Sequence, residues 1–212
     1  DVIVGGPPCQ GVSMFGKRRF VKSQSHNPHE DIRNDLIFTY LKYIEEFNPK
    51  WFMMENVSGL LNLSDGYFLE KFIDRVKDLG YNNYDYKIIN TADYGVPQKR
   101  KRFIFLANRT GNIIPWPKPK FYDKPENWEK PYRNINQVIT GLETDKSQSK
   151  FKNHIPMNHS SEVVERFSYI KEGYKINPDD LPEQLKYSRT GKLIKSFSKV
   201  LFRLDRNQPS HT

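Results

Sequence analysis

Short apolar runs alternate with helix-like patterns through the first half of the chain, and this alternation limits the fold most strongly. Four runs have the length of strands, at residues 1–4, 51–54, 84–89 and 103–107. Apolar residues recur at helical spacing over 35–47, and again from Phe68 to Val76 before Gly80. The order strand, helix, strand, helix, strand is typical of a parallel α/β sheet. We therefore predict an α/β fold with these strands in one sheet.

The texture of the sequence changes after Asn108. Prolines cluster between lysines and aromatic residues from 115 to 131, and the second half is Lys-rich and weakly periodic. We predict a domain boundary near residue 110, a short helix over 161–171 and one or two strands over 193–204. This texture is typical of an insert that reads nucleic acid, and a weakly structured lid is the alternative.

The net charge is +9, from 34 Lys and Arg against 25 Asp and Glu. Such a surplus favours a polyanionic partner, most often nucleic acid, and a basic surface that only aids solubility is the alternative. Hydrophobic residues make up 36% of the chain and aromatic residues 14%, enough for a packed core. No apolar run approaches the ~20 residues of a membrane helix, and no signal-peptide pattern opens the sequence. We expect a cytosolic protein, or a nuclear one if the source is eukaryotic.

The only cysteine, Cys9, lies in the segment GGPPCQGVS at residues 5–13. It comes just after the first predicted strand, where open α/β sheets place their sites. The Pro-Pro step fixes the direction of the chain, and the glycines leave room for a ligand. A small buried thiol is the alternative, although a core cysteine needs no such frame. One cysteine excludes an internal disulfide and a Cys-based zinc site, and we predict no metal.

Glu55-Asn56-Val57 follows the second predicted strand. If the first two strands lie side by side, Cys9 and Glu55 meet at one edge of the sheet. A carboxyl group beside a thiol nucleophile suggests acid catalysis or hydrogen bonding to a heterocycle. The alternative for Glu55 is a cap on the following turn.

A basic segment, QKRKR at residues 98–102, directly precedes the fourth predicted strand. Arg100 and Arg102 alternate with lysines, so on an extended segment they share a face. Their planar guanidinium groups suit a phosphate or a base carbonyl. A charged strand on a solvated sheet edge is the alternative.

These three segments, in this order, resemble the DNA (cytosine-5)-methyltransferase family. The resemblance covers residues 1 to about 107, and further matching segments are RNDL at 33–36, PK at 49–50 and NTADYGVPQ at 90–98. Each piece alone is common, whereas the combination is highly specific. Residues 108–212 resemble the family's target-recognition region only loosely.

The resemblance implies an α/β fold that holds the C-terminal half of a Rossmann-like methyltransferase sheet. Residues 1–109 would be a partial catalytic domain, and residues 110–212 a smaller, irregular target-recognition region that binds DNA. It also implies S-adenosylmethionine as cofactor, double-stranded DNA as substrate and a bacterial cytoplasmic setting. A cognate restriction endonuclease would be a partner of the system.

Catalytic roles follow by resemblance for four residues. Cys9 would be the nucleophile that adds to ring carbon 6 of a cytosine flipped out of the duplex. Glu55 would hold the ring nitrogen and the exocyclic amine. Arg102 would contact the base carbonyl, and Arg100 would help to hold the loop and a phosphate.

Binding roles follow in the same way. Pro8 would orient the nucleophile and border the cofactor, and Leu36 would pack against the cofactor's adenine. The expected contacts to DNA are Gln10, Ser13, Lys17, Arg18, Val57 and Gln98. For the basic loop at 17–19, a plain flexible segment is the alternative.

The sequence also departs from the family pattern. The Gly-rich loop that carries most cofactor contacts, an acidic residue for the ribose, and the closing segment of the cofactor pocket do not occur in it. We therefore expect a piece of a longer protein, with an incomplete pocket, that alone binds S-adenosylmethionine weakly and methylates poorly or not at all.

Three other functions stay open at this point. The branch of the family that methylates transfer RNA usually carries a second cysteine motif, which a chain with one cysteine lacks. A catalytically dead DNA-binding scaffold usually loses the nucleophile or the glutamate, and both Cys9 and Glu55 are present. A redox-sensing thiol protein would leave the arginines unexplained.

Overall fold

A computed structural model describes residues 1–8, 36–140, 142, 157–187, 191, 193 and 201–211. The chain divides into two compact units. The first comprises residues 1–90 and 101–118, and the second comprises 91–100 and 119–212. The segment 91–100 therefore belongs with the second unit, although it lies within the first predicted domain. The functional division at residue 110 stays a prediction.

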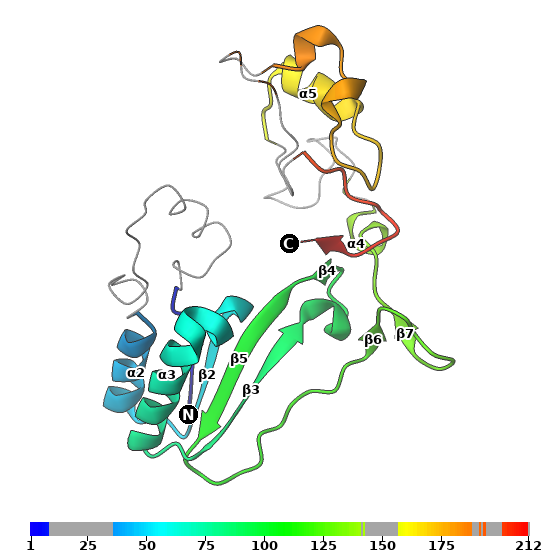
Figure 1. Cartoon of the computed structure of the whole chain (residues 1–212). Helices are drawn as coiled ribbons and strands as arrows, with labels where there is room; N and C mark the ends of the chain where they lie inside the picture. The colour runs from blue at the N-terminus through cyan, green and yellow to red at the C-terminus, as the bar shows by residue number, and fades with distance from the viewer. Residues whose placement is uncertain are drawn as a thin grey trace. The chain divides into compact units, whose positions relative to one another are not determined.

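A four-stranded sheet with helices on one face forms the first unit (Figure 1). Its strands are β1 (Val2–Gly5), β2 (Trp51–Val57), β3 (Asn83–Asn90) and β5 (Lys101–Asn108). Its helices are α2 (Leu36–Phe47), the 3₁₀ helix η2 (Ser58–Gly66) and α3 (Tyr67–Asp78). The strand order is β1-β2-β5-β3, so β1 and β3 are the edges. The predicted strands and helices of this half are confirmed, although β2 continues through Glu55 and Asn56 to Val57.

The sheet is mixed, so the prediction of a wholly parallel sheet is wrong for its fourth strand. β1 and β2 pair in parallel, whereas β5 runs antiparallel to both β2 and β3. A parallel connection needs a crossover of a dozen or more residues. Only residues 91–100 separate β3 from β5, and this short link favours an antiparallel return.

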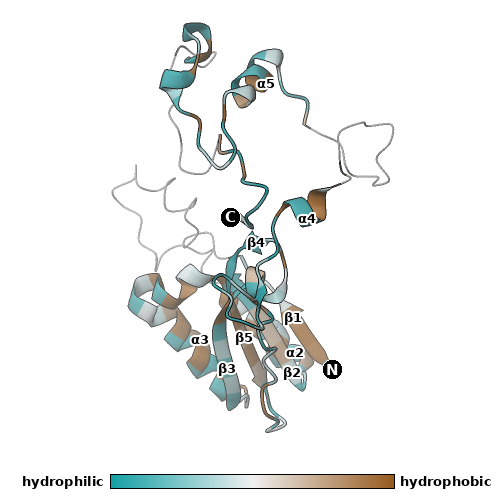
Figure 2. Ribbon diagram, turned by 90° about the vertical axis from the view of Figure 1, so that its right-hand side faces the viewer, coloured by the Kyte–Doolittle hydropathy of each residue, from teal (hydrophilic) through white to brown (hydrophobic). Residues whose placement is uncertain are grey.

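The core of the first unit lies between the sheet and its two long helices. Phe52 and Phe105 stack at a ring-centroid distance of 5.9 Å, and Phe72 of α3 meets Phe105 edge-on at 5.1 Å. All three side chains are fully buried. Apolar residues also run along the edge strand β1, which Figure 2 shows in brown.

The second unit has short elements. Its strands are β4 (Gln98–Lys99), β6 (Phe121–Tyr122), β7 (Lys130–Pro131) and β8 (Ser210–His211). Its helices are α4 (Asn136–Ile139), α5 (Ser161–Ser168) and the 3₁₀ helices η3 (Thr91–Tyr94), η4 (Pro178–Asp180) and η5 (Glu183–Leu185). The predicted helix near 161–171 is thus confirmed, with an earlier end.

Of the strands expected over 193–204, the described part contains two isolated bridges, Tyr187 with Leu193 and Lys175 with Phe202. Within the described residues, no helix is long and apolar enough to cross a membrane.

Candidate active site

Because β1 and β2 pair in parallel, their carboxyl ends lie at the same end of the sheet. Gly5 is in register with Met54, so the residues after Gly5 lie beside Glu55. A Cβ atom built on Gly6 would lie 3.4 Å from Glu55 Oε2. The expectation that the two strand ends lie side by side is therefore confirmed. Five predicted site residues lie outside the described part of the chain: Cys9, Gln10, Ser13, Lys17 and Arg18.

An ion pair joins the central strands β2 and β5 at this end of the sheet. Glu55 Oε1 lies 2.7 Å from Arg102 Nε, and the exposed fractions of the two side chains are 43% and 18%. The strand register explains the contact, because Val57 pairs with Arg102 and Glu55 with Ile104, which makes Glu55 and Arg102 diagonal neighbours on one face. Arg102 Nη1 also donates a hydrogen bond to the carbonyl oxygen of Lys101 at 2.8 Å. Glu55 therefore lies within the strand and is not the turn cap considered as its alternative.

A buried asparagine ties β2 to the segment after β1. Asn56 is 3% exposed, and its Nδ2 donates to the carbonyl oxygen of Pro7 at 3.0 Å. Its Oδ1 accepts the backbone N–H of Val57 at 2.9 Å. Asn56 is not among the site residues predicted from the sequence. The available signal was its strand position, because Phe52 and Met54 at the alternate positions of β2 are fully buried and apolar.

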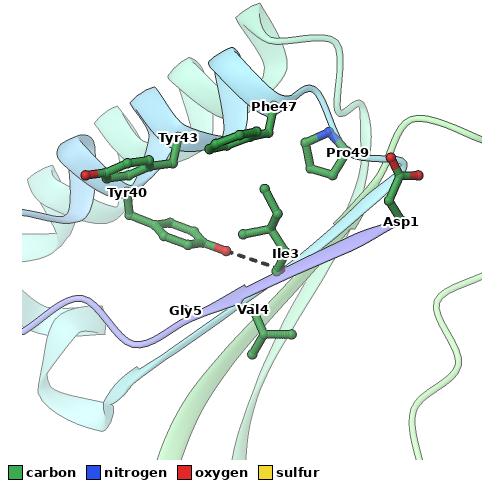
Figure 3. A pocket seen from close by; sticks show the side chains of 8 residues that line it. All are labelled: Asp1, Ile3, Val4, Gly5, Tyr40, Tyr43, Phe47 and Pro49. Carbon is green, nitrogen blue, oxygen red and sulfur yellow. Dashed lines mark hydrogen bonds between the residues drawn. The ribbon is translucent and has the colours of Figure 1, made fainter.

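Tyr40 of α2 supports β1 from the helix side of the sheet (Figure 3). Its hydroxyl group donates to the carbonyl oxygen of Met53 at 3.0 Å and lies 3.5 Å from that of Ile3. The ring packs so closely on Gly5 that a Cβ atom there would lie 2.4 Å from Tyr40 Cε2. Burial raises the pKa of the Tyr40 hydroxyl group, so it stays protonated as a donor. Helical spacing predicted Tyr40 as a core residue but not this contact with Gly5.

The groove in Figure 3 lies between the edge strand β1 and α2. It has a volume of about 580 Å3, and the rings of Tyr40, Tyr43 and Phe47 form its helix side. Tyr43 and Phe47 are 58% and 66% exposed.

The basic segment 98–102 is not one extended strand. β4 ends at Lys99, β5 begins at Lys101, and Arg100 lies between them. The Arg100 N–H donates to the carbonyl oxygen of Gln98 at 3.1 Å, which is a local turn. This turn is centred on Lys99, so residues 98–102 do not form one extended segment, and the sharing of a face by Arg100 and Arg102 stays a prediction. Gln98 lies in β4 of the second unit and is half-buried.

The other predicted binding residues lie near the ends of the first unit's elements. Pro8 is exposed and follows β1 by three residues, and Leu36 is the half-buried first residue of α2. Val57 ends β2 and packs against the core. Among the residues that the structure describes, no group of three or more His, Cys, Asp or Glu side chains could hold a metal ion.

The protein has a mixed α/β sheet with polar side chains where two parallel strands end. Its fold is similar to that of a putative DNA modification methyltransferase encoded within a prophage of E. coli. The TM-score is 0.51 at 20% identity, over 100% of this chain and 62% of that one. Residues 1–209 match the family of C-5 cytosine-specific DNA methylases, and the chain belongs to this family.

Two curated relatives give the sequence likeness in numbers. The chain is 34% identical over 190 residues to the Type II methyltransferase M1.HphI of Haemophilus parahaemolyticus, covering 88% of this chain and 46% of that protein. It is 29% identical over 214 residues to M.NgoFVII of Neisseria gonorrhoeae, covering 100% of this chain and 52% of that protein. The chain thus spans about half the length of these relatives.

Proposed function

We propose that the chain forms part of a DNA (cytosine-5)-methyltransferase that transfers a methyl group from S-adenosylmethionine to carbon 5 of a flipped cytosine. The observation that carries this proposal is the Glu55–Arg102 pair beside Gly6, three residues before the only cysteine. A thiol, a carboxyl group and a guanidinium group are the groups that addition to a cytosine ring needs.

The chemistry explains why these groups belong together. Carbon 5 of cytosine is a poor nucleophile, and addition of the Cys9 thiolate to carbon 6 converts the ring into an enamine. The new bond joins sulfur to carbon 6, the electron pair of the double bond between carbons 5 and 6 shifts to form a double bond between carbons 4 and 5, and the charge develops on ring nitrogen 3. A proton held by Glu55 at the ring nitrogen stabilises that charge. Carbon 5 then takes the methyl group, whose bond to the sulfonium sulfur would break and leave a neutral thioether. A base or water removes the proton from carbon 5, and the bond between carbon 6 and the cysteine sulfur breaks, which restores the ring double bond and the thiolate.

The arginines have separate proposed roles. Arg102 holds Glu55 through Nε, which fixes the direction of the carboxyl group toward the base, and its guanidinium edge contacts the base carbonyl. Arg100, in the turn before β5, contacts a phosphate and the nucleophile's loop. An unperturbed cysteine with a pKa of ~8.5 is mostly protonated at neutral pH, and nearby guanidinium groups favour its thiolate.

Two of the described residues, Pro8 and Leu36, suit the adenine part of the cofactor. Because β1 and β2 are parallel, α2 begins at the edge where β1 ends, so Pro8 and Leu36 both belong to that edge. Their apolar side chains suit an adenine ring. S-adenosylmethionine would supply an electrophilic methyl group on a sulfonium centre. Cofactor contacts from outside these residues are needed to complete the pocket.

Duplex DNA is the proposed substrate, and the net charge of +9 supports a polyanionic partner. Residues 110–212 form the proposed target-recognition region, and residues 1–109 form the proposed second half of the family's catalytic sheet. Gln10, Ser13, Lys17, Arg18, Val57 and Gln98 are the proposed contacts to DNA. By analogy with its Type II relatives, the protein acts in bacterial cytoplasm beside a restriction endonuclease.

The test uses the full-length protein that the gene encodes. Duplex DNA that contains 5-fluorocytosine traps the covalent adduct, because its fluorine cannot leave as a proton does. We expect trapping by the wild type and none by Cys9→Ser. Glu55→Gln should slow methylation ~100-fold or more, as expected for loss of a general acid.

Glu45→Gln is the matched control for the glutamate, because Glu45 also pairs with an arginine, Arg75, but on the helices of the same unit. It should leave the rate unchanged. Transfer RNA serves as the second substrate. Methylation of transfer RNA but not of DNA would overturn the proposed substrate, and full activity of Cys9→Ser would overturn the mechanism.

A further inference from the structure

We infer that Asn56 is a positioning residue that holds the segment leading to Cys9 in its working direction. The inference deepens the proposed function and rests on it. It starts from the hydrogen bond between Asn56 Nδ2 and the carbonyl oxygen of Pro7, 3.0 Å long, which connects two segments 49 residues apart in the chain.

Asn56 is a polar side chain at a buried position, which points to a role beyond packing. It lies on the helix-covered face of β2, where Phe52 and Met54 form part of the apolar core, yet it is 3% exposed. A buried amide costs free energy unless it is hydrogen-bonded. Both of its functional groups are bonded, Nδ2 to Pro7 and Oδ1 to the N–H of Val57. A leucine would pack at this position without that cost but could not bind Pro7.

The bonded carbonyl group lies where the chain leaves the sheet. β1 ends at Gly5, and Pro7 is already beyond the ladder that β1 makes with β2. The ring of Pro7 fixes φ, and the following Pro8 restricts ψ to extended values, so the remaining freedom is the exact ψ within that range, which sets the direction of the carbonyl group. By holding this oxygen, Asn56 selects ψ within that range and with it the direction in which the chain continues to Pro8, the residue before Cys9 in the sequence.

Tyr40 holds the same segment one step earlier. Its ring packs on Gly5 and its hydroxyl group donates to Met53, so β1 is fixed against β2 up to Gly5. Asn56 extends this support past the end of the strand. A reacting group displaced by about 1 Å can lose ~100-fold in rate, so such support bears on turnover more than on binding.

Asn56→Asp gives a test that a purely structural role would not pass. An ionised carboxylate cannot donate to the Pro7 oxygen, whereas a protonated carboxyl group can donate to it and still accept the Val57 N–H. The ratio of the variant's kcat to that of the wild type should therefore rise as the pH falls from 8 to 5.5. For Asn56→Ala the same ratio should be low, by ~10-fold or more, and independent of pH.

Other titratable or charged groups lie near Asn56. In the described part of the first unit, the charged pair Glu55 and Arg102 lies in β2 and β5 beside Asn56, and Tyr40 of α2 lies on the helix-covered face. The wild type carries the same groups and Cys9, so the ratio of the two profiles reports what the new carboxyl group adds. KM for DNA should change less than twofold.

Asn108 supplies the matched control. It is also fully buried in the same unit, and its Nδ2 donates to the carbonyl oxygen of Asn112 at 2.9 Å. It pairs with Trp51 at the start of β2, the opposite end from Asn56. Asn108→Asp should lower the melting temperature and leave kcat and its pH profile unchanged.

These variants are measured in the full-length protein, and each outcome either supports or contradicts the positioning role. A pH-independent Asn56→Asp ratio, or the same kcat change in Asn108→Asp, would overturn the positioning role. If Asn56→Asp does not fold, Asn56→Ala against Asn108→Ala decides through the split between kcat and KM. A folded wild type that methylates neither DNA nor transfer RNA would refute the proposed function, and this inference with it.

Discussion

Among the described residues of the first unit, sixteen buried residues from α2, η2, α3, the central strands and Tyr81 form one apolar cluster, whereas the apolar cluster in the described part of the second unit has four. The first cluster includes fully buried rings that meet in stacked and edge-on pairs, such as Phe52 with Phe105. The second consists of Ile170, Ile176, Leu181 and Leu185, with Leu201 packed against it.

Directional polar contacts replace apolar burial in the second unit. Arg166, 8% exposed, donates from Nε to the Leu185 carbonyl oxygen at 2.9 Å and from Nη2 to that of Tyr187 at 2.6 Å. Arg206 binds Glu172 through both its backbone N–H and its Nε. The comparison teaches that the strand ends of the candidate site rest on a close-packed frame, while the other unit depends on a few hydrogen bonds between loops.

Phe105→Ala should produce the largest effect, because Phe105 is fully buried at the centre of the first cluster. Its ring meets those of Phe52, Phe72 and Tyr84 at 5.1–5.9 Å. Removing a buried ring costs about 3–5 kcal/mol of unfolding free energy. Urea unfolding followed by circular dichroism measures it.

Phe47→Ala is the control for that change, because Phe47 is 66% exposed at the end of α2. Its unfolding free energy should shift by less than about 0.5 kcal/mol. A similar loss in both variants would show that the cluster around Phe105 is not the source of the first unit's stability.

The sequence predicted most of the first unit and little of the second, for physical reasons. Strands and helices that bury one face carry a period, so Ile37, Leu41 and Ile44 could be recognised from spacing alone. Periodicity does not report the antiparallel direction of β5, and the available signal was the link at 91–100, which is too short for a parallel crossover. The second unit has short elements held by side-chain bonds between distant residues, such as Arg166 with Tyr187, and these leave no period.

The candidate site divides in the same way. Glu55 and Arg102 were recognised from their motifs, and their pairing follows from a register that only the sheet supplies. Asn56 and Tyr40 act through backbone carbonyl groups, whose positions a sequence does not reveal. The turn at Lys99 could not be predicted because alternating Lys and Arg look the same in a strand and in a break between strands.

Gly5→Ala should give the next effect, because the first unit has no room for an added methyl group there. The new Cβ would lie 2.4 Å from a ring atom of Tyr40, well inside contact distance. Overpacking of this kind costs about 1–3 kcal/mol. Thermal unfolding of the variant measures the loss, which is expected as a lower melting temperature.

Gly6→Ala is the neighbouring control. Its Cβ would meet Glu55 Oε2 at 3.4 Å, an ordinary contact at the end of a side chain that is 43% exposed. It should unfold at nearly the wild-type temperature. Equal losses at Gly5 and Gly6 would contradict the assignment of the effect to Tyr40.

Arg166→Met tests the polar side of the comparison. Methionine keeps an apolar stem but leaves the carbonyl oxygens of Leu185 and Tyr187 without this donor, a loss on the order of 2 kcal/mol. Amide hydrogen exchange of residues 181–187 should quicken, while the amides of β2 and β5 keep their protection. Lys186→Met, which removes a more exposed pair with Glu183, should change little. Loss of protection in both units would show that they unfold together.

Glu172 should give the smallest effect, and one that depends on pH. Hydrogen bonds from the Arg206 backbone N–H and guanidinium group lower the pKa of Glu172 below 4.5. A carboxyl group whose pKa is lowered by folding stabilises the fold above its unfolded pKa, and this contribution disappears as the pH falls through the folded pKa. At pH 7, Glu172→Gln should therefore speed exchange of the Gly173 and Arg203 amides, which bond to Arg203 and Tyr174 carbonyl oxygens. As the pH falls through the folded pKa the variant and the wild type should converge, whereas Glu165→Gln on the exposed side of α5 should match the wild type throughout. A difference that persists unchanged into acid would mean that the Glu172 charge does not hold these two segments together.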